Sequence, residues 1–178
     1  MAGKRILYVP GRTFKWKEDA SGNLEFGFNC GDLADGSQWE GKIADLRGNG
    51  LGSAGLFAGS YAAFSICNPS GTPDAGGTFD WRLAIAYSAA VATEGMTGLH
   101  LGDDSSYSSG DEHHDNMILL GSHKKPASGS TTSSYLGIFD LPTPWVAAHG
   151  DNNTGSALDG TAQPAELWLV ERIRVEHG

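Results

Sequence analysis

The sequence lacks an apolar run of about 18 residues, the length needed for a membrane-spanning helix. Charged side chains make up only 19% of its 178 residues, fewer than the roughly 25% of average globular domains. Its two cysteines, Cys30 and Cys67, are too few for a disulfide framework. We therefore expect a small globular chain with two buried thiols, and a single bridge between them stays an open alternative.

Familiar catalytic and targeting motifs are also missing. The chain has no G-x-S-x-G nucleophile elbow, and carboxylate pairs such as Asp32 and Asp35 have the spacing of ordinary turn acids. Residues 1–10 are basic but lack the apolar core and small-residue cleavage site of a signal peptide. The sequence predicts a protein that is made in the cytoplasm, is not an enzyme and has no catalytic residues.

Glycine is abundant instead, with 26 residues, about twice its average frequency. The glycines follow no collagen-like period, and short apolar runs remain readable between turn-forming Gly, Ser, Asn and Asp. This pattern is typical of a chain with many tight turns between strands. We therefore predict an all-β fold.

Alternation of apolar and polar residues marks the expected strands. The clearest run is 78–88, where every second side chain from Phe79 to Tyr87 is large and apolar. Glu171 interrupts the apolar face of the last run, which predicts an edge or a β-bulge near it. Roughly eight such strands favour a two-sheet antiparallel β-sandwich of jelly-roll or Greek-key type. The runs are 4–9, 12–17, 24–28, 61–67, 78–88, 117–120, 135–139, 145–149 and 166–176.

Charge is unevenly distributed. The first 17 residues hold five basic side chains and no acid, whereas the other 161 carry 7 basic and 21 acidic ones. The acidic body argues against nucleic-acid binding, because phosphates repel it. We predict a basic extended or hairpin arm over residues 1–30 and a sandwich domain over 31–178. The alternative is one or two amphipathic strands whose cations are simply solvated.

The basic arm supplies the candidate partner-binding residues. Two aromatics would serve as apolar anchors, and the cations would form a charged rim suited to an acidic partner. The predicted set is Lys4, Arg5, Arg12, Phe14, Lys15, Trp16 and Lys17.

Three other patterns could indicate a cofactor, cation or sugar site, but a structural role is favoured for each. Gly50–Gly55 matches G-x-G-x-x-G, but no buried strand precedes it and no helix follows, so we predict no cofactor. The acidic and histidine residues of 103–115 could hold a cation, but they lack EF-hand spacing, and a solvated loop is favoured over a metal site. Trp16, Trp39, Trp81, Trp145 and Trp168 could stack on sugars, but packing in strands is the favoured role.

Residues 33–178 resemble a family of virion proteins in the order and style of their segments. An apolar strand from Tyr61 is followed by N-P-S-G-T-P at 68–73, A-G-G at 75–77 and T-F-D-W-R-L at 78–83. N-N-T-G-S-A-L-D at 152–159 then precedes the final strand. This arrangement is similar to small β-sandwich cement or decoration proteins that bind the assembled capsids of tailed phages.

The resemblance implies a non-enzymatic structural role on the capsid surface of a virion. It implies the major capsid protein as partner, a homo-oligomer, most often a trimer, and no membrane or nucleic-acid binding. The alternative function is a receptor- or carbohydrate-binding β-sandwich module of a phage tail or fibre.

Overall fold

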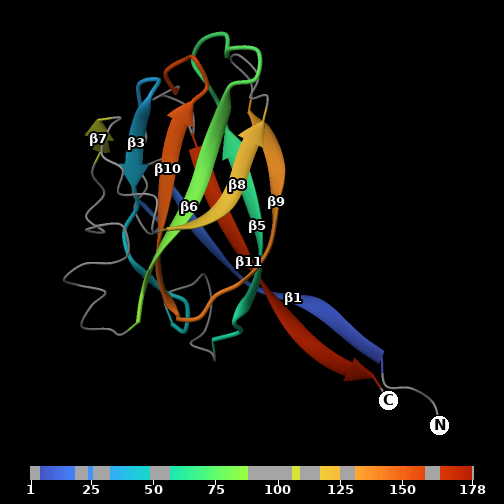
Figure 1. The fold of residues 1–178 in the computed structure, drawn as a ribbon. Helices are drawn as coiled ribbons and strands as arrows, with labels where there is room; N and C mark the ends of the chain where they lie inside the picture. The colour runs from blue at the N-terminus through green and yellow to red at the C-terminus, as the bar shows by residue number, and fades with distance from the viewer. Residues whose placement is uncertain are drawn as a thin grey trace.

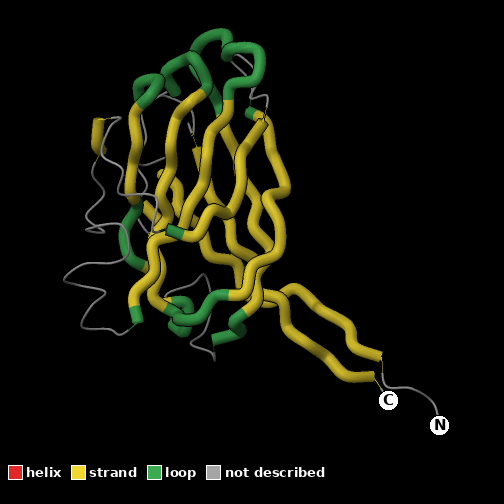
Figure 2. Tube along the Cα trace, in the orientation of Figure 1, coloured by secondary structure: helices red, strands yellow, loops and turns green. Residues whose placement is uncertain are grey.

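The computed structural model describes residues 5–18, 24–25, 33–48, 57–87, 106–108, 117–124, 131–158 and 165–177. Within these residues the chain is all-β and has no helix (Figures 1 and 2). Two antiparallel sheets pack against each other. The predicted two-sheet antiparallel β-sandwich is confirmed. No helix in the described ranges is long and apolar enough to cross a membrane.

The first sheet has the strand order β2-β1-β11-β5-β9, and the second has the order β7-β3-β10-β6-β8, with β4 paired to β10. The strands are β1 (Arg5–Glu18), β2 (Leu24–Glu25), β3 (Ser37–Glu40), β4 (Ala44–Asp45), β5 (Ser60–Cys67), β6 (Thr78–Ala86), β7 (Ser106–Ser108), β8 (Ile118–Lys124), β9 (Thr132–Asp140), β10 (Trp145–Asn153) and β11 (Ala165–His177).

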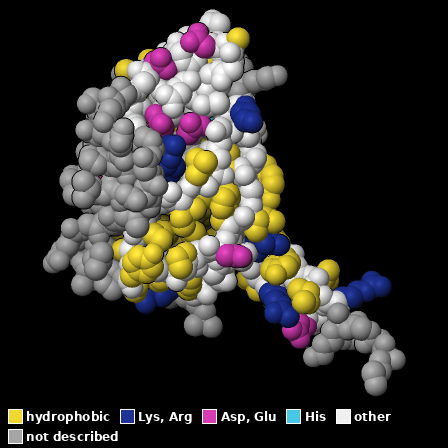
Figure 3. Space-filling model, in the orientation of Figure 1, with side chains coloured by type: hydrophobic (Ala, Val, Ile, Leu, Met, Phe, Trp, Pro, Cys, Tyr) yellow, Lys and Arg dark blue, Asp and Glu magenta, His cyan; other side chains and the backbone are white. Residues whose placement is uncertain are grey.

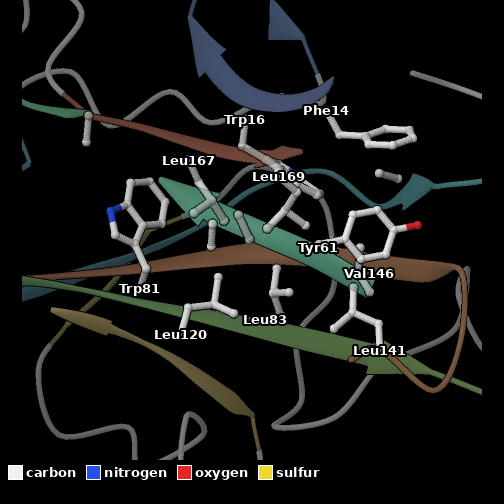
Figure 4. Close-up of a cluster of buried hydrophobic side chains, with 14 of the residues drawn as sticks. Phe14, Trp16, Tyr61, Trp81, Leu83, Leu120, Leu141, Val146, Leu167 and Leu169 are labelled. Atoms are coloured by element: carbon white, nitrogen blue, oxygen red, sulfur yellow. The ribbon is translucent and has the colours of Figure 1, made fainter. Parts of the chain in front are cut away.

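The core lies between the sheets and is built from every second side chain of the strands, those that point toward the other sheet (Figure 4). Its five largest side chains are aromatic, and burying one large apolar side chain stabilises the fold by about 1.5–3 kcal/mol. Its largest members have no exposed surface: Phe14, Trp16, Tyr61, Phe79, Trp81, Leu83, Leu167 and Leu169.

Two strand regions go beyond the runs expected from alternation. Residues 33–46 have no such run, yet they contain β3 and β4. The run 145–149 continues as β10 through Asn153. The buried Asn152 amide donates to the carbonyls of Leu33 (3.0 Å), Ala34 (3.2 Å) and Ser156 (2.9 Å). These bonds hold the 33–34 segment against the end of β10.

Strand β1, which lies within the predicted N-terminal arm of residues 1–30, is a strand of the sandwich. Phe14 and Trp16 in β1 belong to the core, and β1 pairs with β11 along most of its length. The contact with β2 is short and joins Lys17 to Glu25 and Glu18 to Leu24. Residues 5–18 are therefore an extended strand of the first sheet.

Candidate functional site: an arm built from both ends of the chain

A two-stranded arm projects from the sandwich (Figures 1 and 2). It consists of residues 5–10 of β1 and residues 172–177 of β11, paired from Arg5↔His177 to Pro10↔Arg172. The pairing of β5 with β11 ends at Glu171. Among the described residues, the arm therefore has no third strand. A two-stranded ribbon is marginally stable by itself in water, so this arm is a candidate for docking.

The arm has two chemically different faces, because residues paired directly across two strands share a face. The apolar face carries Leu7 and Val9 opposite Val175 and Ile173, with Arg5 at the tip. The other, the basic face, carries Ile6, Tyr8, Pro10, Arg172, Arg174 and Glu176. On the basic face, the Arg172 guanidinium lies 4.0 Å from the Tyr8 ring centroid, and Arg174 pairs with Glu176 at 2.8 Å.

The apolar face continues the core-facing side of the first sheet. Leu167 and Leu169 of β11 point into the core and are fully buried. The same alternation leads past Glu171 to Ile173, which is 44% exposed, while Leu7 on the paired strand is 49% exposed. The second sheet does not reach the arm (Figure 1). The hydrophobic stripe of the core therefore continues out of the sandwich onto the arm, where no described residue forms a layer over it.

A β-bulge marks the base of the arm. The register shifts between Pro10 and Thr13, so that Gly11 and Arg12 together oppose Glu171. A bulge bends a strand and increases its twist, which suits a point where a ribbon leaves the sandwich. The bulge predicted near Glu171 is confirmed.

Glu171 and Arg12 lock this bulge. The Glu171 carboxylate accepts hydrogen bonds from the Arg12 backbone N–H (2.9 Å) and Nε (3.0 Å), and Arg12 Nη2 completes a bidentate ion pair. Arg12 also donates to the carbonyls of Leu46 (2.9 Å) and Arg47 (2.8 Å). Hydrogen bonding to Glu171 raises the pKa of Arg12, although burial acts in the opposite direction. This network fixes where the arm leaves the body.

An open pocket of about 820 Å³ lies beside the base of the arm. Its wall combines the arm with the segment that leads into β5, and it includes Tyr8, Arg172, Ile173, Phe57 and Ser60. Arg172 Nη1 donates to Ser60 Oγ at 3.2 Å across this junction. The pocket therefore lies where the arm meets the body and is lined by side chains of both.

The predicted anchors Phe14 and Trp16 do not lie on a docking surface. Both have 0% exposed surface. Trp16 Nε1 donates to the Lys42 carbonyl at 2.9 Å, and the Phe14 ring packs edge-on against Tyr61. Both side chains are therefore core residues of the sandwich, because the alternation that suggested an apolar face marks a strand buried by the second sheet.

The predicted cations are dispersed. Arg5 lies on the arm and is exposed, whereas Lys4 falls outside the described residues. Arg12 is engaged at the base by Glu171, and Lys15 lies on the body, where its Nζ sits 4.1 Å from the Trp168 ring centroid. Lys17 is half-buried on β1. Of the described members of the predicted set, only Arg5 belongs to the arm.

The C-terminal half of the arm is not distinguished in the sequence from the rest of the last strand. Arg172, Ile173, Arg174 and Val175 all lie within the predicted run 166–176. Their alternation of basic and apolar residues is visible in the sequence. Nothing local indicates that their partners are residues 5–10, at the opposite end of the chain.

A buried serine–histidine pair was another possible site. Ser65 Oγ lies 2.9 Å from His123 Nδ1 and accepts from Trp81 Nε1 at 2.6 Å, while His123 Nε2 lies 2.8 Å from Thr132 Oγ1. Ser65 and His123 are 0% and 1% exposed, so a substrate cannot reach them without opening the sandwich. Burial lowers the pKa of His123. This network satisfies polar groups between the sheets and is structural.

The other sequence motifs provide no candidate cofactor, cation or sugar site among the described residues. Gly50–Gly55 lies outside the described residues, as does all of 103–115 except β7. Arg47 covers the Trp145 ring at 4.6 Å from its centroid, and Trp81 is fully buried. The described ranges contain no cluster of three or more His, Cys, Asp or Glu side chains placed to hold a metal ion.

Cys67 is a free, buried thiol, and burial raises its pKa to about 12. A thiol with so high a pKa is almost entirely protonated at neutral pH and is therefore unreactive. Cys30 lies outside the described residues.

Comparisons with protein-family models, with curated proteins and with solved structures found no match to this chain.

Proposed function

We propose that this chain is a non-enzymatic structural protein of a tailed-phage virion, a capsid cement or decoration protein that docks through its arm. The observation that carries the proposal is the arm itself, which projects from the sandwich with exposed apolar and basic side chains. Its partner would be the major capsid protein, and several copies, most simply a trimer, would clamp neighbouring capsid subunits.

The charge of the arm supports an acidic partner surface. The arm carries Arg5, Arg172 and Arg174 against Glu176, a net charge of +2 with His177 neutral, whereas the whole chain is −9. The rest of the chain is therefore −11. On the basic face, Tyr8 and Pro10 supply apolar contact beside the guanidinium groups, a composition typical of protein interfaces. Such a site would bind faster and more tightly at low ionic strength.

The test is cosedimentation of the purified chain with capsids of the phage that encodes it. We expect Arg172→Ser/Arg174→Ser to weaken capsid binding at least tenfold at low salt. The matched control is Lys42→Ser/Lys124→Ser, which removes the same charge from exposed positions on the body. Equal loss in both variants would mean that net charge matters and the arm does not. Absence of the wild-type chain from capsids, with binding to host-cell sugars, would favour the tail-module alternative instead.

A further inference from the structure

Large apolar side chains are exposed on the arm and on the body (Figure 3). Leu119 in β8 and Tyr87 after β6 are 56% and 72% exposed, and they belong to neither of the two groups described next. The arm carries Ile6, Leu7, Tyr8, Val9 and Ile173. The outer face of the first sheet carries Phe64, Tyr135 and Ile138, which are 39%, 56% and 51% exposed. Exposed apolar patches on soluble proteins commonly mark sites of association.

The second group forms a continuous patch at the β5–β9 edge. Tyr135 and Phe64 are paired across the strands, with ring centroids 5.3 Å apart, and Ile138 pairs with Ala62. A bulge between Ala63 and Phe64 brings Tyr135 and Ile138 to the same face although they are three residues apart. We call Phe64, Tyr135, Ile138 and the neighbouring exposed Asp140 the β9 patch.

The apolar face of the arm and the β9 patch complement each other in three respects. Both expose aliphatic or aromatic side chains without a covering layer among the described residues. Their lengths are similar at about 3.4 Å per residue, about 14 Å from Arg5 to Val9 and about 17 Å from Tyr135 to Asp140. Each ends in one exposed charge of opposite sign, Arg5 on the arm and Asp140 on the patch.

We infer that the partner of the apolar face is a second copy of this chain, whose β9 patch receives the arm. The arm projects away from its own sandwich, so the contact must join two molecules (Figure 1). Because the two surfaces differ, the contact is head-to-tail, and repetition closes a ring when the rotation between copies allows it. The basic face of the arm stays available for the partner proposed above. The inference holds whether or not that partner is a capsid.

Light scattering on the purified full-length chain tests this contact. We expect wild type to form a closed oligomer whose mass falls on dilution. Leu7→Ser/Ile173→Ser on the arm and Tyr135→Ser/Ile138→Ser on the patch should each raise the dissociation constant at least tenfold. Matched controls are Ile6→Ser, on the basic face, and Tyr87→Ser, an exposed tyrosine outside both surfaces. Both controls should associate as wild type does.

A mixture of the two double variants identifies the geometry. In a head-to-tail contact, one variant keeps an intact patch and the other an intact arm, so the mixture should give a dimer and nothing larger. A charge exchange adds a second readout: Arg5→Asp and Asp140→Arg should each weaken association, and their combination should restore it. A monomeric wild type at high concentration would overturn the inference. So would a patch variant that associates normally, because the arms would then pack on one another.

Discussion

Strands β1 and β11 pass through two regions of the molecule, and the same side-chain pattern has opposite consequences there. In the body, Phe14 and Trp16 of β1 and Leu167 and Leu169 of β11 are fully buried beneath the second sheet. In the arm, the same apolar alternation remains about half exposed. The difference shows that alternation specifies which face is apolar, whereas the presence of a second layer decides whether that face becomes core or interface.

Matched truncations of one side chain in each region should differ most in their effect on the free energy of unfolding. Trp16→Ala should lower the free energy of unfolding by about 3–5 kcal/mol, because it leaves a large cavity between the sheets. Leu7→Ala should change it by less than about 0.5 kcal/mol under conditions where the chain is monomeric. Urea unfolding followed by tryptophan fluorescence measures both, with circular dichroism as a probe that does not depend on Trp16. Equal losses would mean that the arm is part of the cooperative core.

The base of the arm should be the next most sensitive point. Glu171→Gln leaves the Arg12 guanidinium without its charged partner in a site where Arg12 is only 16% exposed. We expect a loss of about 2–3 kcal/mol, since a buried charged hydrogen-bonding group is costly to leave unpaired.

The matched control for this ion pair lies on the arm. Arg174→Gln removes an exposed pair, Arg174–Glu176, whose side chains are 56% and 48% exposed. It should cost less than about 0.5 kcal/mol. Thermal unfolding of both variants in low and high salt checks the ranking. A larger effect of Arg174→Gln would contradict the assignment of the base as the fixed point.

The stability of the sandwich should also depend on pH through His123, but this effect should be smaller. Its pKa is lowered in the folded chain because burial disfavours the charged form. The neutral histidine therefore stabilises the fold fully above its unfolded pKa, near 6.5, and the stability falls as pH drops below that value. One proton accounts for at most about 1.4 kcal/mol per pH unit.

Stability curves between pH 7.5 and 5.5 for wild type and His123→Gln measure this effect. The difference between the two proteins should shrink as the pH falls, because the variant has no imidazole to protonate. A constant difference across this range would assign the acid sensitivity to other groups.

Several features were predictable because they depend on neighbouring residues. The run 78–88 predicts β6 because it has five large apolar side chains at alternate positions. Glu171 indicates the bulge because it interrupts an otherwise apolar face. The basic and aromatic residues near the N-terminus also indicated a candidate partner-binding segment in what is now β1. They did not indicate that Arg5 lies on the arm whereas Phe14 and Trp16 lie in the core.

The sequence by itself determined the all-β class, most of the strands and the apolar face of each strand, because these follow from local composition and a two-residue period. The tertiary structure alone decided that residues 5–10 pair with residues 172–177 and that the second sheet stops short of them. Strand partners far apart in the chain leave no local signature, and burial depends on what packs above a face. The apolar stripe of β1 and β11 is therefore core at one end and exposed at the other.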